Sequence, residues 1–283
     1  MALIVKELNI YPMKSARRIA LQEAELLAYG LKGDRVAMLT DPSGKFITQR
    51  LMPDLAKLNV RQEADVFTLW LENGPSLTAS ATDNEMRVRV WDDMMSAATA
   101  SEAVNEELSS WFGREVILCF VDHRTERFAD PKWAEGSVPV TFADGFPLLV
   151  TTTASLAALN ANMQAHGEES VPMERFRPNI VIENDEPWAE DFWQTIEING
   201  IEIDLVKPCT RCIMTTQDQL TGSRDVPTPM PAMARLRMSG DYRVTGLLFG
   251  WDAFAKSTGV IRVGDEVRVL SQRTEGWALR KRG

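Results

Sequence analysis

The chain has 283 residues, 45% of them hydrophobic, and a formal net charge of −9 at pH 7. This composition predicts a globular protein with a substantial core and argues against a basic nucleic-acid surface. No apolar run reaches the 18 residues that a membrane helix needs, and no signal-peptide pattern is present. The acidic charge and the lack of a membrane-helix pattern lead us to expect a protein that binds neither nucleic acid nor a membrane. Because no signal peptide is visible and the three cysteines suit a reducing compartment, we expect a cytoplasmic protein.

The first half of the chain reads as short strands followed by one helix. Apolar and polar residues alternate in segments bounded by Gly, Pro, Asn or Asp, which is typical of strands. The predicted strands span residues 5–11, 36–39, 66–71, 86–91 and 116–121. Between the last two, an apolar stripe predicts a helix that starts near Ser101, where Thr99 and Glu102 have capping-box spacing.

The second half also consists mostly of strands. We expect, in chain order, a strand at 138–142, a turn at 143–147, a helix at 154–163 and hairpins at 195–206 and 260–270. Asn199 and Gly200 mark the turn of the first hairpin, because this pair adopts the tight turn that joins antiparallel strands. Gly264 and Asp265 mark the turn of the second hairpin.

The polar segment 122–136 has no clear period, and we place a domain boundary there. The predicted units are 1–121, 122–272 and a basic C-terminal tail at 273–283. Because strands dominate both halves, we expect a mainly β, α+β fold with covering helices, built from two β-barrel-like domains.

Cys209 and Cys212 form the most informative motif. A single C-x-x-C also occurs as half of a zinc site, as a redox dithiol and as two buried small residues. Structural zinc needs four ligands, and only Cys119, His123 and His166 remain to supply two of them. A redox dithiol normally opens a helix after a strand, whereas this motif follows a hairpin. If the segment is extended, its two sulfurs face opposite sides of the strand.

Basic residues surround this motif in the sequence. Arg211 and Lys207 place positive charge near Cys212, which favours a thiolate. Thiolates are the ligands that hold soft or high-valent metals. Cys212 is therefore a candidate thiolate that could face a ligand, and we expect Cys209 to be a buried small residue.

Three further basic clusters lie elsewhere in the chain. Arg175 and Arg177 precede a predicted strand, Lys14 lies in the basic segment 11–18, and Arg35 ends a tight turn. Each of these clusters also suits an exposed surface. An anionic ligand in a protein of net charge −9 nevertheless needs several converging cations, and arginine can bind a phosphate through two nitrogens.

Seven ordered motifs give the chain a family resemblance. They are YPMKS at 11–15, GDR at 33–35, ITQR at 47–50, FADGFPLL at 142–149, FRPNIVI at 176–182, KPCTRC at 207–212 and VGDEV at 263–267. Together they resemble MOSC proteins with an N-terminal β-barrel domain, which include amidoxime-reducing and hydroxylaminopurine-detoxifying members. The resemblance runs from about residue 4 to residue 270.

The resemblance implies that Cys212, the second cysteine of the C-x-R-C motif, binds the molybdenum of a pterin cofactor. It also implies a set of residues around the pterin and its phosphate. These residues are Lys14, Ser15, Arg35, Asp144, Gly145, Arg177, Asn179, Thr210, Arg211 and Cys212. Gly145 would let the backbone approach a ligand closely.

The activity that the resemblance implies is reduction of N-hydroxylated compounds, such as hydroxylamines, hydroxylaminopurines and amidoximes, to amines. With only two histidines in the chain, Asp144 or a metal-bound water is the candidate general acid. The alternatives are a carrier of the molybdenum cofactor, a sulfur carrier that uses Cys212, and a plain β-barrel binding module. An all-cysteine iron–sulfur cluster takes four cysteines, so we expect a separate electron donor, either a ferredoxin or a flavin reductase.

Overall fold

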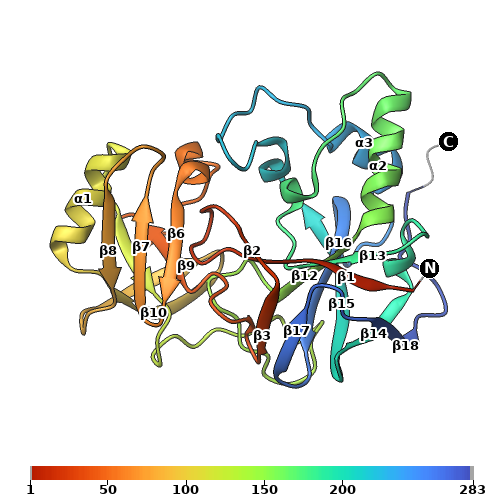
Figure 1. Cartoon of the computed structure of the whole chain (residues 1–283), viewed down its shortest axis with the longest axis horizontal. Coiled ribbons are helices and arrows are strands. Elements are labelled where there is room, and N and C mark those ends of the chain that lie inside the picture. The colour runs from red at the N-terminus through yellow and green to blue at the C-terminus, as the bar shows by residue number, and fades with distance from the viewer. Residues whose placement is uncertain (1, 281–283) are drawn as a thin grey trace.

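The computed structural model describes residues 2–280, which form two lobes lying side by side (Figure 1). Residues 59–120, coloured orange to yellow, form most of the lobe on the left in this view. Residues 148–272, coloured green to blue, form most of the other lobe. Strands outnumber helices throughout, so the predicted mainly β, α+β fold with covering helices is confirmed.

An eight-stranded sheet is the largest element of the second lobe. Its strands, in spatial order, are β18 (Val267–Gln272), β14 (Trp193–Ile198), β15 (Ile201–Arg211), β16 (Leu247–Ala255), β12 (Leu148–Thr152), β13 (Ile180–Glu183), β1 (Ile4–Ile10) and β2 (Ile19–Leu21). Only β12 and β13 are parallel neighbours, and the other pairs are antiparallel. Its inward side chains, mostly Ile, Leu and Val, form the largest hydrophobic cluster.

Three smaller sheets complete the described strands. One is ordered β5 (Ala37–Thr40), β11 (Ile117–Phe120), β10 (Asp93–Thr99) and β9 (Glu85–Val90). The second is β6 (Asn59–Glu63), β7 (Val66–Trp70) and β8 (Ser76–Ser80). The third is β17 (Gly259–Arg262), β3 (Glu23–Leu27) and β4 (Gly30–Leu31).

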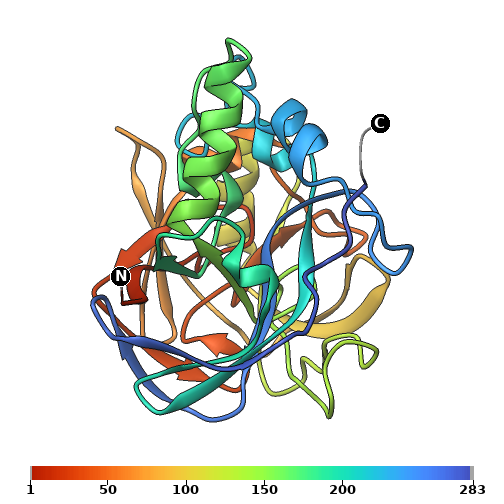
Figure 2. The same ribbon diagram turned by 90° about the vertical axis from the view of Figure 1, so that its right-hand side faces the viewer.

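The helices cover these sheets. The α-helices are α1 (Glu102–Phe112), α2 (Thr153–Ala165) and α3 (Met230–Leu236), and the short 3₁₀ helices are η1 (Pro53–Lys57), η2 (Met173–Phe176), η3 (Ala189–Asp191) and η4 (Ile213–Thr216). Figure 2 shows α2 and α3 next to each other, and both contribute to one hydrophobic cluster with β13 and β16. Helix α1 begins where predicted, but the residue preceding it, Ser101, makes no side-chain capping hydrogen bond.

One predicted hairpin is confirmed and the other is wrong. Strands β14 and β15 pair directly, and Asn199 and Gly200 between them both have positive φ, 49° and 78°, as the tight turn requires. Strands β17 and β18 do not pair with each other, because β17 joins β3 and β18 joins β14. Gly264 still makes a turn, but it redirects the chain from one sheet to another.

The predicted strand at 138–142 is also wrong. This segment has one isolated bridge, between Phe128 and Pro139, and no ladder. Side chains bond its carbonyl groups instead: Arg127 Nη1 donates to the Thr141 oxygen at 2.9 Å and Lys14 Nζ donates to the Phe142 oxygen at 2.8 Å. Scattered backbone bonds satisfy other groups of the segment, such as Val140 N to the Arg127 carbonyl at 2.9 Å and Phe142 N to the Arg35 carbonyl at 3.0 Å.

The first strands of the chain belong to the second lobe. Strand β1 pairs with β13, and β3 pairs with β17. The division into 1–121 and 122–272 stays a prediction, and these strands cross it. At the start of the predicted tail, Arg273 donates to the Trp193 and Leu205 carbonyl groups and lies over the Trp251 ring. Residues 281–283 of that tail lie outside the described residues.

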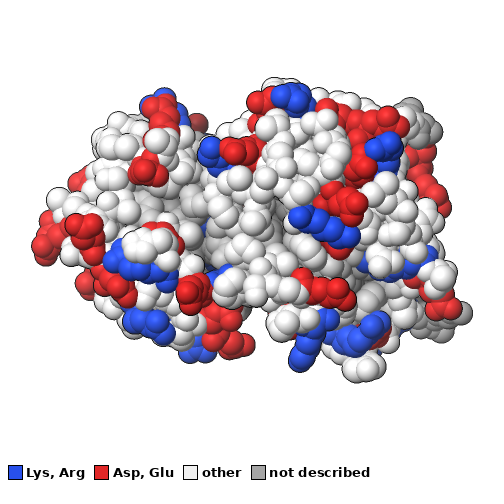
Figure 3. Space-filling model, turned by 90° about the horizontal axis from the view of Figure 1, so that it is seen from below, with Lys and Arg blue, Asp and Glu red and all other residues white. Residues whose placement is uncertain are grey.

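Charges of both signs are interspersed on the face shown in Figure 3, and no continuous basic stripe is visible there. Among residues 2–280, no helix has the length and the apolar composition that crossing a membrane requires.

Candidate functional site

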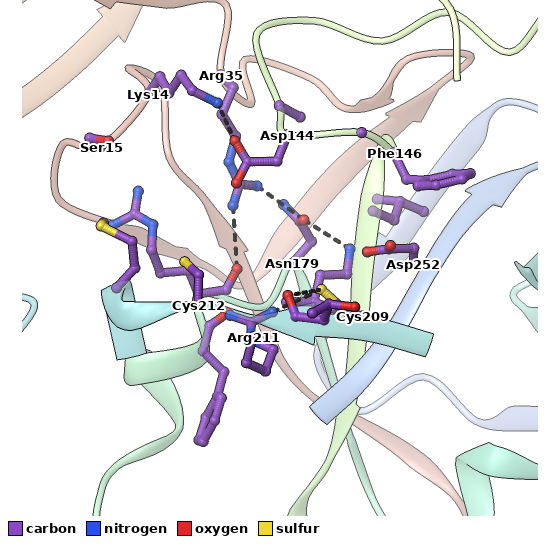
Figure 4. A pocket seen from close by; sticks show the side chains of 18 of the residues that line it. Lys14, Ser15, Arg35, Asp144, Phe146, Asn179, Cys209, Arg211, Cys212 and Asp252 are labelled. Carbon is purple, nitrogen blue, oxygen red and sulfur yellow. Dashed lines mark hydrogen bonds and ion pairs between the residues drawn. The ribbon is translucent and has the colours of Figure 1, made fainter. Parts of the chain in front are cut away.

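A cavity of about 260 Å³ brings the expected site residues together (Figure 4). All ten residues that the resemblance implies around the cofactor line this cavity. They come from the β1–β2 connection, the turn at 33–35, the loop 143–147, the start of β13 and the end of β15. The fold thus collects them from segments that are far apart in the sequence, while their individual roles stay predictions.

Lys14 and Asp144 form an ion pair at one side of the cavity. The Lys14 side chain is 6% exposed, and its ammonium donates to Asp144, which is 68% exposed. Burial lowers the pKa of Lys14 although Asp144 opposes this effect. The charge and hydrogen bond of Lys14, helped by Arg50 and Trp91, outweigh the desolvation of the Asp144 carboxyl by the surrounding protein and hold its pKa well below its usual range. Asp144 is therefore ionised at neutral pH.

Arg35 and Arg177 stack on Tyr11. Their guanidinium carbons lie 4.2 Å and 4.0 Å from the centroid of the Tyr11 ring. Burial raises the pKa of Tyr11 to about 12 and lowers that of Arg177 to about 10. Both arginines have positive φ, 48° and 54°, a conformation that larger side chains rarely adopt. Neighbouring contacts must hold both residues in this strained geometry.

The Asn179 side chain makes three hydrogen bonds within the protein. Its Oδ1 accepts hydrogen bonds from Arg35 Nη1 at 3.0 Å and from the Leu149 amide at 3.1 Å. Its Nδ2 donates to the Asn9 carbonyl at 3.1 Å. Asn179 thus positions Arg35 and ties β13 to β12 and β1.

The cysteine motif departs from the sequence interpretation. Cys209 and Cys212 both line the cavity and both are half-buried, so Cys209 is less buried than we expected. The pairing of β15 with β16 shifts register between Pro208 and Thr210. This irregularity breaks the simple alternation of side chains that would have placed the sulfurs on opposite faces.

The cation that donates a hydrogen bond to Cys212 was not predicted, although Arg211 also interacts with Cys212 through its charge. Arg50 Nη2 donates to the Cys212 sulfur at 2.9 Å, whereas Arg211 Nη1 donates to the Cys209 sulfur at 3.0 Å. Successive residues of a strand point to opposite sides, so a neighbour in sequence is poorly placed to contact the adjacent side chain. Arg50 lies within the ITQR motif, but its role could not be read from that motif.

A second carboxylate lies on β16. Asp252 is 15% exposed, and its Oδ2 lies 3.5 Å from Lys207 Nζ. Burial raises its pKa despite Lys207, Cys209 and Arg211. Burial, reinforced by the Asp252 charge, raises the pKa of Cys209 to about 12, so this thiol stays protonated at neutral pH. Asp252 had no signal in the sequence.

The described residues argue against a zinc site. No group of three or more His, Cys, Asp or Glu side chains within residues 2–280 is arranged to hold a metal. Cys119, the third cysteine, lies in a separate apolar cluster, where its sulfur is 3.7 Å from Thr40 Oγ1. Burial raises the pKa of Cys119 to about 11. The zinc alternative for Cys209 and Cys212 is therefore not supported.

Comparisons with known proteins identify the family to which this chain belongs. Sequence models of the MOSC N-terminal beta barrel domain and the MOSC domain match residues 2–115 and 137–268. The chain is 31% identical to mitochondrial amidoxime-reducing component 1 of Mus musculus over 95% of this chain and 82% of that protein. The chain belongs to the MOSC family.

Other relatives of this MOSC protein are similar over the same extent. Mitochondrial amidoxime-reducing component 1 of Homo sapiens is 29% identical over 95% of this chain and 83% of its own length. Mitochondrial amidoxime reducing component 2 of Homo sapiens is 28% identical over 93% and 82%. The similarity therefore includes both lobes of this MOSC protein.

Proposed function

We propose that this MOSC protein is an oxidoreductase that holds a molybdenum cofactor through Cys212 and reduces N-hydroxylated compounds to amines. The observation that carries the proposal is that the Cys212 sulfur and a group of basic side chains line one cavity. Relatives that match along most of this chain are named for the reduction of amidoximes. Amidoximes and related hydroxylamines are therefore the proposed substrate class.

The residues of the cavity fit an anionic cofactor. Six basic side chains line it, against two carboxylates: Lys14, Arg35, Arg50, Arg177, Lys207 and Arg211, against Asp144 and Asp252. Such an excess of positive charge in a protein of net charge −9 favours a bound anion. Arg211 Nε is also buried without a hydrogen-bond partner. A methyl group added to Gly145 would meet no protein atom within 4 Å, so the space beside this glycine is free.

The chain's own residues would have distinct tasks. Cys212 would provide the sulfur ligand, and Arg50 would hold that sulfur in place by donating to it. Lys14 would bind phosphate oxygens, because its ammonium lies at the cavity wall and Asp144 orients it. Asp144 is ionised, so we assign it this orienting role and not that of proton donor.

The bound cofactor would supply the two-electron redox chemistry. In the net reaction the N–O bond of the substrate breaks, two electrons and two protons are taken up, and an amine and water leave. The three cysteines of this chain cannot supply the four ligands of an all-cysteine iron–sulfur cluster, so the electrons come from a separate donor protein. We propose a ferredoxin or a flavin reductase for this role and a cytoplasmic location for the reaction.

Protein produced in a host that makes the molybdenum cofactor tests this function. We expect about one molybdenum per chain by elemental analysis, and turnover of an amidoxime with a chemical donor such as reduced methyl viologen. NADH alone should give no turnover. Molybdenum without turnover of any N-hydroxylated compound would favour the carrier hypothesis, and zinc in place of molybdenum would overturn the proposal.

A further inference from the structure

Trp91 lies at the turn between β9 and β10, beside the cavity. Its φ of 57° is in the left-handed region, which a bulky residue rarely adopts. The residue remains 41% exposed, although an indole offers a large hydrophobic area for burial. A strained backbone that presents an exposed aromatic ring next to a cavity suggests a role in binding.

Three side chains hold this indole in one orientation. Arg50 places its guanidinium carbon 4.8 Å from the ring centroid, and the Phe46 ring meets it at 5.1 Å with an angle of 63° between the planes. The indole nitrogen donates to Asp144 Oδ1 at 3.3 Å. The backbone is held as well, because Arg89 Nε donates to the Trp91 carbonyl at 2.8 Å. The ring is fixed by these contacts and remains partly open to solvent.

The indole is connected to the proposed metal ligand through one residue. Arg50 lies over Trp91 and also donates to the Cys212 sulfur. A single residue therefore separates the fixed aromatic ring from the Cys212 sulfur.

We infer that Trp91 is a specificity-determining residue whose exposed indole stacks on the flat aromatic body of an N-hydroxylated substrate. This inference rests on the proposed function. Aromatic rings gain more from offset or edge contacts with an indole than saturated rings of similar size do. The enzyme should therefore prefer aromatic amidoximes and aromatic hydroxylamines over their saturated counterparts, with the N–O group directed inward.

Paired substrates test this preference. Benzamidoxime and cyclohexanecarboxamidoxime have similar size, but only the first has an aromatic ring. With reduced methyl viologen as donor, Trp91→Leu should raise the KM for benzamidoxime roughly three- to tenfold, the loss expected for one aromatic contact. The KM for the saturated compound should change less than about twofold, and Trp91→Phe should retain most of the preference.

Trp111→Leu is the matched control, because Trp111 is also an indole that donates to a carboxylate, Glu107 at 2.7 Å, but it lies on α1. It should leave both KM values unchanged. Equal effects of Trp91→Leu on the two substrates, or no effect on either, would overturn the inference. Since a chemical donor replaces the partner protein, a changed KM reports substrate binding and not partner docking.

A binding measurement separates this inference from the proposed function. Calorimetric titration of the oxidised, molybdenum-containing protein with each compound needs no turnover. We expect tighter binding of benzamidoxime by the wild type and loss of that difference in Trp91→Leu. If the wild type turns over neither compound yet shows this difference, the proposed reduction is contradicted while the stacking on Trp91 is supported. If turnover is normal but the difference is absent, only the stacking on Trp91 is contradicted.

Discussion

Arg50 Nη2 donates a hydrogen bond to the Cys212 sulfur at 2.9 Å, although 162 positions separate the two residues. Arg50 belongs to the segment just before η1, and Cys212 follows the end of β15. A single charged group therefore connects the segment before η1 with the end of β15. It also places a guanidinium where a sulfur ligand would carry negative charge.

Arg50→Met should lower the molybdenum content of the purified protein. A hydrogen bond to a charged group is worth about 1.5–3 kcal/mol, so cofactor affinity should fall on the order of tenfold or more. Elemental analysis after dialysis measures this loss. Arg61→Met serves as control, because Arg61 is 62% exposed on β6 and pairs only with Glu63 among the contacts described. Equal molybdenum in the two variants would contradict the role of Arg50.

Cys212→Ser should abolish reductase activity and release the metal, because an alcohol is a far weaker acid and a harder ligand than a thiol. Cys209→Ser should keep most of the molybdenum. The measurement is the molybdenum-to-protein ratio of each variant, together with its thermal midpoint to confirm folding. Comparable loss in both variants would instead indicate that the two sulfurs act as a pair.

The Cys209 thiol should react slowly with iodoacetamide near neutral pH, although the residue is half-buried and lines the cavity. Burial and the Asp252 charge raise its pKa to about 12, so the reactive thiolate increases only as pH rises toward that value. In cofactor-free Cys212→Ser protein, mass spectrometry of the labelled peptide measures the rate. Asp252→Asn should speed labelling at each pH where Asp252 is ionised and Cys209 is still mostly protonated, because it removes a negative charge beside the sulfur. An unchanged rate would argue against that electrostatic effect.

Arg177→Ala should destabilise the cofactor-free protein as well as weaken cofactor binding. Arg177 donates to Gln219 Oε1 at 3.0 Å and to the Ala16 carbonyl at 2.9 Å, and it stacks on Tyr11. Losing such charged hydrogen bonds costs about 1.5–3 kcal/mol of unfolding free energy. Urea unfolding of the cofactor-free protein measures the change in unfolding free energy without any contribution from cofactor binding.

Arg18→Ala is the control for that experiment. Arg18 is 36% exposed and makes ion pairs with Glu7 and Glu174, and exposed pairs contribute about 0–1 kcal/mol. If Arg177→Ala unfolds like the wild type but loses molybdenum, Arg177 acts on the cofactor alone.

The sequence by itself was enough to predict the mainly β fold, the hairpin at Asn199–Gly200 and ten of the residues that line the cavity. Local signals carry these features. Alternation of apolar and polar residues indicates strands, and an Asn-Gly pair between two such runs indicates a tight hairpin turn. Seven motifs in order indicate the family. The ten site residues are recognisable because each belongs to one of these motifs.

Tertiary structure alone decided which of these residues touch one another. Segment 138–142 looks like a strand, but Lys14 and Arg127 donate to two of its carbonyl groups, those of Phe142 and Thr141. Strands β17 and β18 look like a hairpin, but β17 pairs with β3 and β18 pairs with β14, in two different sheets. Arg50 and not Arg211 donates a hydrogen bond to the Cys212 sulfur. The packing of distant segments determines which side chains lie within hydrogen-bonding distance of each other. Contacts between residues more than a hundred positions apart leave no periodic signal in either segment, so only the folded chain reveals them.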